Sequence, residues 1–231
     1  MAERRADPYR DLDVIDGRAP RVNQATIGSL AVVAYVVDWW LLLAILGLQL
    51  LVGLTFGRRF CLPCLTYFEL IQPRFGEGPI EDSRPPRFAN LVGVVFLGAA
   101  SVAHIAGLEA LGWTLGLLVA GLALLAATTG LCVGCELYRL SAHIRGVRGH
   151  RLDQMDLADL GAGEADDVVV LFTHPLCTDC HTLERRLVSE GRDLVMVDVT
   201  ERPDLARKYG IAVVPTAVEV GKGVVTARIA G

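Results

Sequence analysis

The stretch ATIGSLAVVAYVVDWWLLLAILGLQLLVGLTF, residues Ala25–Phe56, contains a single charged side chain, that of Asp38. As one helix, its 32 residues would be about 48 Å long, whereas the hydrocarbon core of a bilayer is about 30 Å thick. Asp38–Trp40 lies near the middle of the stretch, and a carboxylate beside two indole rings favours a membrane interface over the bilayer centre. We therefore expect a tight hairpin of two membrane helices, near 22–37 and 39–56.

A second apolar stretch, Phe88–Leu131, also contains no Lys or Arg. It is interrupted at Gly107–Trp113, where two glycines, a glutamate and a tryptophan occur together. The same reasoning predicts a second hairpin, with helices near 88–106 and 113–133.

The cationic residues are distributed by region. Arginines occur before the first hairpin, between the hairpins and after the second, and both predicted hairpin tips lack Lys and Arg. Cationic segments stay in the cytoplasm, and four spans place all of them on one side, whereas three spans would divide them. We therefore expect a multi-pass protein of the plasma membrane, surrounded by the lipid bilayer, with both termini in the cytoplasm.

The overall composition agrees with this division. Hydrophobic residues make up 52% of the chain and charged residues 21%, with a formal net charge of −4. Nucleic acid is not expected as a partner, because the soluble C-terminal segment is not strongly basic and has no platform of aromatic and basic residues. The predicted parts are a cytoplasmic N-terminal segment at 1–21, a four-span membrane domain at 22–142, a linker at 143–165 and a soluble domain at 166–231.

All six cysteines occur as Cys-x-x-Cys pairs, namely Cys61/Cys64, Cys132/Cys135 and Cys177/Cys180. Pairs with this spacing carry out thiol–disulfide exchange or bind a metal ion. The first two lie at the end of the predicted second helix of each hairpin, and the third lies in the soluble segment. With four spans, all three pairs lie on the cytoplasmic side of the membrane.

The two hairpins resemble each other in sequence. Pro-Arg opens each of them, at Pro20 and Pro86, and each closes with Cys-x-x-Cys-x-x-Tyr. Two copies of an even-span unit are related by a pseudo-two-fold axis along the membrane normal. This symmetry would bring the two membrane cysteine pairs close to the axis.

The soluble segment has a β-α-β-α-β-β pattern. We expect strands at Asp167–Phe172, Leu194–Val199, 216–220 and 224–229, with one helix running from the cysteine pair to Gly191 and another at 201–209. A thiol at the start of a helix meets free N–H groups and the positive end of the helix dipole, which lower its pKa.

Cys177-x-x-Cys180 after a strand, and Val214-Pro215-Thr216 before the next, resemble thioredoxin-like proteins over roughly 166–231. The resemblance implies an α/β domain in which Pro215 is cis and lies beside the dithiol. It also implies that Cys177 attacks a disulfide and that Cys180 resolves the mixed disulfide. The chain departs from the family pattern, because it lacks the tryptophan before the first cysteine, the buried acid on the first central strand and the final helix.

The membrane half is similar to a bacterial family, domain of unknown function 4395, over roughly 12–142. The motifs that carry the similarity are Pro20–Gln24, Pro86–Phe88 and Thr129–Cys135. The resemblance implies a four-span domain in the bacterial plasma membrane and supplies no activity.

Three interpretations of the membrane cysteines follow. The leading one is a relay of electrons with Cys177 and Cys180 in a membrane-anchored thiol–disulfide oxidoreductase, which needs no cofactor and acts on a protein or small-molecule thiol or disulfide. The alternative is a metal-binding membrane module, with zinc or another soft ion held by Cys61, Cys64, Cys132 and Cys135. The third is a pair of inert interfacial motifs. The sequence sets no oligomeric state.

Overall fold

The computed structural model describes residues 6–148, 155–156, 159–160, 167–211, 213–221 and 223–229. The chain divides into two compact units. We call Asp7–Gly78 with Ser83–Tyr138 the helical unit, and Pro79–Asp82 with Arg139–Gly231 the sheet unit. Most of the linker expected at 143–165 lies outside the described residues, although its first residues continue a helix as far as Arg148.

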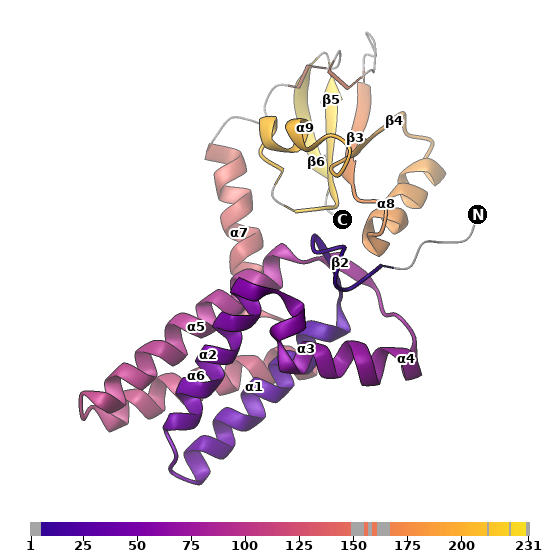
Figure 1. The fold of residues 1–231 in the computed structure, drawn as a ribbon. Coiled ribbons are helices and arrows are strands. Elements are labelled where there is room, and N and C mark those ends of the chain that lie inside the picture. The colour runs from indigo at the N-terminus through magenta and orange to yellow at the C-terminus, as the bar shows by residue number, and fades with distance from the viewer. Residues whose placement is uncertain are drawn as a thin grey trace. The chain divides into compact units, whose positions relative to one another are not determined.

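The helical unit is built around two helical hairpins (Figure 1). Its elements are β1 (Val14–Asp16), α1 (Arg18–Val36), α2 (Leu41–Phe56), η1 (Arg58–Phe60), α3 (Leu62–Thr66), η2 (Tyr67–Ile71), α4 (Gln72–Phe75), α5 (Arg84–Ile105) and α6 (Glu109–Thr129), and α7 (Val133–Arg148) begins in it.

The hairpin turns lie where the sequence places them. The first occurs at Asp38, which has a positive φ of 51°, and the second at Gly107, with a φ of 76°. The helix ends differ from the prediction by up to four residues. Helix α5 begins before residue 88 because prolines fit the first helical turn, and α6 ends before residue 133 because Gly130 forms a left-handed C-cap.

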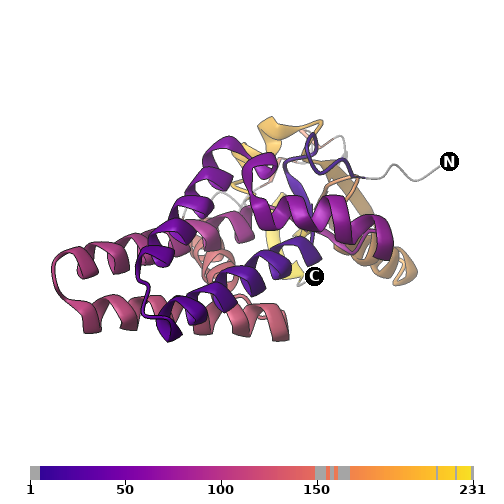
Figure 2. The same ribbon diagram turned by 60° about the horizontal axis from the view of Figure 1, so that its bottom comes forward.

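The two hairpins pack against each other so that α1 lies on α6 and α2 on α5 (Figure 2). Their shared core combines small and large side chains, among them Ala31, Ala100 and Ala120 with Leu43 and Leu97. Small residues let helix backbones approach closely, which is how helices associate in membranes.

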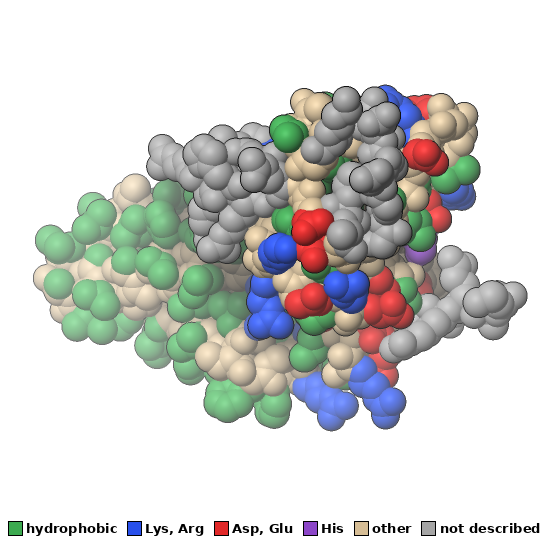
Figure 3. All heavy atoms as spheres, turned by 90° about the horizontal axis from the view of Figure 1, so that it is seen from above, with side chains coloured by type: hydrophobic (Ala, Val, Ile, Leu, Met, Phe, Trp, Pro, Cys, Tyr) green, Lys and Arg blue, Asp and Glu red, His purple; other side chains and the backbone are tan. Residues whose placement is uncertain are grey.

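Among the residues that the structure describes, two helices are long and apolar enough to cross a membrane, α5 and α6. Helix α2 is apolar but has only 16 residues. The outward faces of the hairpins carry many exposed large hydrophobic side chains, such as Val36, Leu48, Val102 and Leu118, and Figure 3 shows hydrophobic side chains covering this part of the surface. The predicted four-span arrangement therefore has two helices of sufficient length, and the other two spans stay a prediction.

The sheet unit contains a four-stranded mixed sheet. Its elements are β2 (Ile80–Asp82), β3 (Asp167–Thr173), α8 (Thr178–Ser189), β4 (Leu194–Asp198), α9 (Pro203–Lys208), β5 (Thr216–Gly221) and β6 (Val224–Ile229). The strand order is β4-β3-β5-β6, with β3 parallel to β4 and antiparallel to β5. Val170 pairs with Val195 on one side and with Val218 on the other.

Strand β3 is buried on both faces, which explains its continuous apolar sequence. Alternate residues enter two different cores. Val170 and Phe172 pack into the cluster that contains both cysteines of the sheet unit, whereas Leu171 packs with Leu183 and Leu187 of α8. Strand β3 therefore packs against both the cysteine pair and helix α8, which holds the start of α8 close to the end of the strand.

Candidate functional site

The first candidate site is the cysteine pair of the sheet unit. Cys177 is the N-cap of α8, and its sulfur accepts a hydrogen bond from the Cys180 backbone N–H at 3.2 Å. The two cysteines form a disulfide with their Cα atoms 5.2 Å apart. Only 1% of Cys177 and none of Cys180 is exposed. The first sulfur thus lies where backbone N–H groups stabilise a thiolate once the disulfide is reduced.

The loop before β5 lies beside this pair. Val214 belongs to the same buried cluster as Cys177 and Cys180, and the Val214–Pro215 peptide bond is cis. The Val214 backbone N–H donates to the Asp82 carboxylate at 3.3 Å.

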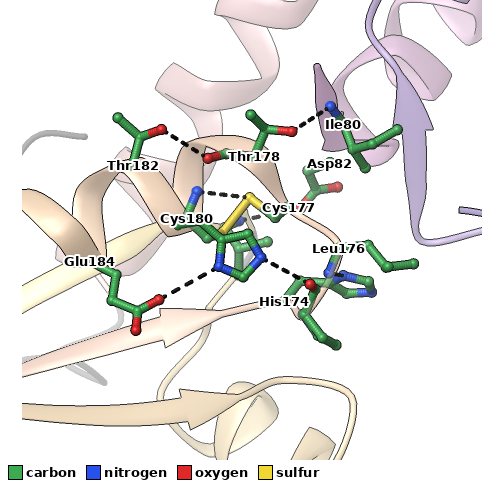
Figure 4. Close-up of a disulfide and its surroundings, with 12 residues drawn as sticks. Ile80, Asp82, His174, Leu176, Cys177, Thr178, Cys180, Thr182 and Glu184 are labelled. Carbon is green, nitrogen blue, oxygen red and sulfur yellow. Dashed lines mark hydrogen bonds and ion pairs between the residues drawn. A yellow bond between two sulfur atoms is a disulfide. The ribbon is translucent and has the colours of Figure 1, made fainter. Parts of the chain in front are cut away.

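Strand β2 contributes a second contact at the pair, as Figure 4 shows. The Ile80 backbone N–H donates to Oγ1 of Thr178, which stands between the two cysteines, at 2.9 Å. Ile80 and Asp82 are each 7% exposed. The chain's own residues therefore occupy the surface of the sheet unit that surrounds the disulfide.

Two histidines order the loop that precedes the pair. His174 is buried, and its Nδ1 accepts a hydrogen bond from the Leu176 backbone N–H at 3.1 Å. His181 lies with Nε2 2.9 Å from the Pro175 carbonyl oxygen and Nδ1 3.5 Å from a Glu184 carboxylate oxygen. These contacts join both ends of the cysteine turn.

The second candidate site is Cys61/Cys64 in the helical unit, and its local geometry matches that of the first. Cys61 is the N-cap of α3, and its sulfur accepts a hydrogen bond from the Cys64 backbone N–H at 3.4 Å. The two cysteines form a disulfide with Cα atoms 5.2 Å apart. They are 7% and 9% exposed and pack with Ala19, Tyr67 and Phe68.

A buried carboxylate links several segments of this region, and no motif in the sequence indicates it. Asp16 is 2% exposed and accepts hydrogen bonds from the Tyr67 hydroxyl at 2.8 Å, the Gln72 amide at 3.2 Å and the Gly78 backbone N–H at 2.8 Å. Burial and the hydrogen bond to Asp16 raise the pKa of Tyr67 above its usual range. Asp16 thereby ties β1 to the segment that carries Cys61 and Cys64.

The third pair, Cys132 and Cys135, consists of two free thiols at the start of α7. The Cys135 backbone N–H donates to the Cys132 sulfur at 3.4 Å. A hydrogen bond from the Cys135 side chain, together with backbone N–H groups and the Gln24 side chain, lowers the pKa of Cys132 to about 6, against the opposing effect of burial. Cys132 is therefore largely a thiolate at neutral pH.

Two adjacent residues of α1 contact the two pairs of the helical unit. Asn23 places its Oδ1 3.9 Å from the Cys61 sulfur and donates from Nδ2 to Asn90 at 3.3 Å, while Gln24 hydrogen bonds to Cys132.

Metal binding by the membrane cysteines has no structural support. In the part of the chain that the structure describes, no three His, Cys, Asp or Glu side chains lie close enough together to hold a metal ion. The zinc site at Cys61, Cys64, Cys132 and Cys135 stays a prediction.

A cavity of about 90 Å³ lies beside Cys61 and Cys64. Its wall is mainly apolar, and its polar side chains are Asn23, Gln49, Arg58, Ser83, Arg87 and Asn90. The Arg58 guanidinium donates to the carbonyl oxygens of Pro8, Asp11, Leu12 and Val14. Burial and the nearby charge of Arg87 lower the pKa of Arg58 to about 10, so its side chain remains charged at neutral pH.

Comparison with known proteins identifies one family. The family described as Domain of unknown function (DUF4395) matches residues 15–143, more than half of the chain. No curated protein matches the chain, and no solved structure does.

Proposed function

Because the chain belongs to the DUF4395 family, whose description names no reaction, we propose its function from the cysteine pairs: a membrane-anchored thiol–disulfide oxidoreductase. Cys177 and Cys180 exchange disulfides with a protein or small-molecule substrate. The observation that carries the proposal is the position of Cys177 at the N-cap of α8, with the Cys180 N–H directed at its sulfur.

The proposed reaction begins from the reduced pair. The Cys177 thiolate attacks one sulfur of a substrate disulfide, and the electron pair of the broken bond leaves on the other substrate sulfur. Cys180 then attacks the Cys177 sulfur of the mixed disulfide, which releases the second substrate thiol and forms the Cys177–Cys180 disulfide. One substrate disulfide is reduced and one dithiol is oxidised. Because the cytosol keeps thiols reduced, a cytoplasmic pair suits reduction or redox sensing.

The fold of the sheet unit supports this chemistry. A cysteine pair follows strand β3, and a Val-Pro-Thr segment leads into β5, which is the order expected of a thioredoxin-like domain. We assign the sheet unit to that fold class as part of the proposal.

The membrane pairs would serve as partners in the relay. Cys61 has the same N-cap geometry as Cys177, and Cys132 carries a thiol with a lowered pKa. Both features suit thiols that exchange disulfides. The direction in which electrons pass among the three pairs is left to experiment.

A four-span arrangement in the bacterial plasma membrane completes the proposal. The 16 residues of α2 are about 24 Å long, somewhat short of a hydrocarbon core of about 30 Å, and local thinning of the bilayer accommodates such a mismatch. The distribution of arginines then places both termini and all three cysteine pairs on the cytoplasmic side.

The test is the disulfide reductase activity of the full chain in lipid nanodiscs. Replacing Cys177 and Cys180 together by Ser should lower the rate by at least about tenfold, because the change removes the thiolate that attacks the substrate. Ser189→Ala, at the exposed far end of α8, is the matched control and should keep the activity. Undiminished reduction by the double variant would refute the proposal.

A trapping experiment identifies the partner. In Cys180→Ser, a mixed disulfide on Cys177 cannot be resolved and accumulates. Acid quenching of membranes followed by peptide mapping should find Cys177 joined to a membrane cysteine or to a substrate protein. Joining to Cys61, Cys64, Cys132 or Cys135 supports the relay, whereas joining only to another protein removes the relay from the proposal.

A further inference from the structure

The cavity beside Cys61 and Cys64 is small. Its volume of about 90 Å³ is well below the roughly 300–1,000 Å³ of sites for drug-sized ligands. Both cysteines line it, so a small molecule inside it contacts the disulfide directly.

The charge of the cavity has one sign. Its lining residues include two arginines and no Asp or Glu. The Arg58 guanidinium is already bonded to four backbone carbonyls, and Asp11 and Asp13 lie near enough to offset part of its charge. The Arg87 side chain is exposed, and among the described residues it has no hydrogen bond or ion pair. Arg87 is therefore the cation that remains for a ligand.

The polar groups next to the disulfide suit a sulfur that gains and loses a proton. Asn23 Oδ1 lies 3.9 Å from the Cys61 sulfur, where it can accept a hydrogen bond from a reduced thiol. The Cys64 N–H donates to the same sulfur and stabilises it as a thiolate. The cavity thus combines an electron acceptor, groups that stabilise its reduced form and an unpaired cation.

We propose that this cavity admits a small anionic thiol and that the Cys61–Cys64 disulfide accepts electrons from it. This inference rests on the proposed function, because it requires the membrane pair to be redox-active. A first thiolate attacks one sulfur of the disulfide, and the electron pair passes to the other cysteine sulfur. A second thiolate attacks the resulting mixed disulfide. Two small thiols become one small disulfide, and the two cysteines take up two protons as they become thiols.

The experiment compares three thiols of similar size and different charge. They are 2-mercaptoethanesulfonate, which is anionic, 2-mercaptoethanol, which is neutral, and 2-aminoethanethiol, which is cationic. The full chain carries Cys177→Ser and Cys180→Ser, so that the sheet unit has no cysteine that can exchange disulfides. It is held in nanodiscs of zwitterionic lipid. Differential alkylation and peptide mass spectrometry follow the reduction of Cys61–Cys64 at equal thiolate concentrations.

The anionic thiol should reduce the pair roughly threefold to tenfold faster than the neutral one, and the cationic thiol should be slowest. Arg87→Gln should remove most of this order, as should high salt. The matched control is Arg59→Gln, since Arg59 lies over the Tyr9 ring and does not line the cavity; it should leave the order unchanged.

Two outcomes would overturn the inference, and they differ in their consequence for the proposed relay. Equal rates for the three thiols, or an order that Arg87→Gln does not alter, refute recognition of an anion and leave the pair redox-active. Failure of every thiol to reduce Cys61–Cys64 in the native protein, with reduction after denaturation, also removes this pair from the proposed relay.

Discussion

At the scale of single residues, the three cysteine pairs share a local geometry and differ in their neighbours. Each first cysteine accepts a backbone N–H from the second. The neighbours of Cys61 are Asn23 and the hydrogen-bonded pair Tyr67 and Asp16. The neighbour of Cys132 is Gln24, whose side chain forms a hydrogen bond with it. Chemical differences among the pairs therefore arise from side chains supplied by other elements.

The lowered pKa of Cys132 predicts its reactivity with pH. The rate of alkylation by iodoacetamide should be half-maximal near pH 6 and fall below that pH, because the thiolate becomes protonated. An ordinary thiol would give a midpoint near about 8.5. Gln24→Ala should raise the midpoint by roughly half a unit to one unit, since it removes a hydrogen bond to the thiolate.

The control for this profile is Gln49→Ala, which removes an amide beside Cys61 instead. It should leave the Cys132 midpoint in place. A wild-type midpoint near pH 8.5 would show that the hydrogen bonds around Cys132 do not stabilise its thiolate.

The Asp16 network predicts a loss of stability in Tyr67→Phe. The change removes the hydroxyl that donates to a buried carboxylate, and hydrogen bonds to charged groups contribute about 1.5–3 kcal/mol. Three donors remain on Asp16, from Arg18, Gln72 and Gly78, so we expect the lower end of this range. Thermal unfolding in detergent measures it, with Tyr35→Phe as the control, because Tyr35 is half-exposed and its ring packs edge-on against Trp113. Equal midpoints for the two variants would contradict this role of Asp16.

At the scale of elements, each cysteine turn of the helical unit lies in close contact with a helix. A Cβ on Gly53 of α2 would stand 3.1 Å from the Cys61 Cβ, and one on Gly134, between Cys132 and Cys135, would stand 2.7 Å from the Ala89 Cβ. The Gly134 contact leaves no room for a side chain unless the backbone shifts, and the Gly53 contact is tighter than ordinary van der Waals contact. Each cysteine turn therefore packs closely against a helix.

The contacts of strand β2 around the cysteine pair predict that weakening them makes Cys177 more accessible to an alkylating reagent. Asp82→Ala removes the acceptor of the Val214 N–H and weakens the hold of the sheet unit on Ile80–Asp82. Alkylation of the reduced Cys177 should accelerate about twofold to tenfold, because local opening becomes easier. Asp204→Ala removes an exposed carboxylate of the same unit and should leave the rate as it is. Equal rates in wild type and Asp82→Ala would mean that β2 does not shield the cysteine.

At the scale of the whole molecule, the chain combines a helical unit with an apolar outer surface and a sheet unit with its own core. In the described part of the chain, two helices are long and apolar enough to cross a bilayer. Both pairs of the helical unit follow the ends of α2 and α6, opposite the hairpin tips. A bilayer around the hairpins would thus separate the tips from the cysteines.

The four-span topology predicts which residues are reached from outside the cell. In a variant whose native cysteines are Ser, a single cysteine at Asp38 or Glu109, in the hairpin tips, should react with a membrane-impermeant maleimide in intact cells. A cysteine at Glu190, exposed on the sheet unit, should react only after lysis. Labelling of the Glu190 position in intact cells would invert the topology and favour an oxidising compartment.

The sequence by itself determined the two hairpins, their turns at Asp38 and Gly107, the order of elements in the sheet unit and the start of a helix at Cys177 and Cys180. These follow from hydrophobic runs, turn residues and helix signals, which act over a few neighbouring residues. Helix ends were less well predicted, because prolines and a glycine cap moved them by up to four residues.

Only the tertiary structure decided which distant side chains meet at each pair. Asp16 bonds to Tyr67, Asn23 lies beside Cys61, Gln24 reaches Cys132, and Asp82 accepts from Val214. None of these contacts has a signal in a short stretch of sequence, because each joins segments brought together by burial of apolar surface elsewhere. The same packing encloses the arginine-lined cavity at Cys61 and Cys64. The cysteine motifs thus come from local sequence, and their individual chemistry comes from the fold.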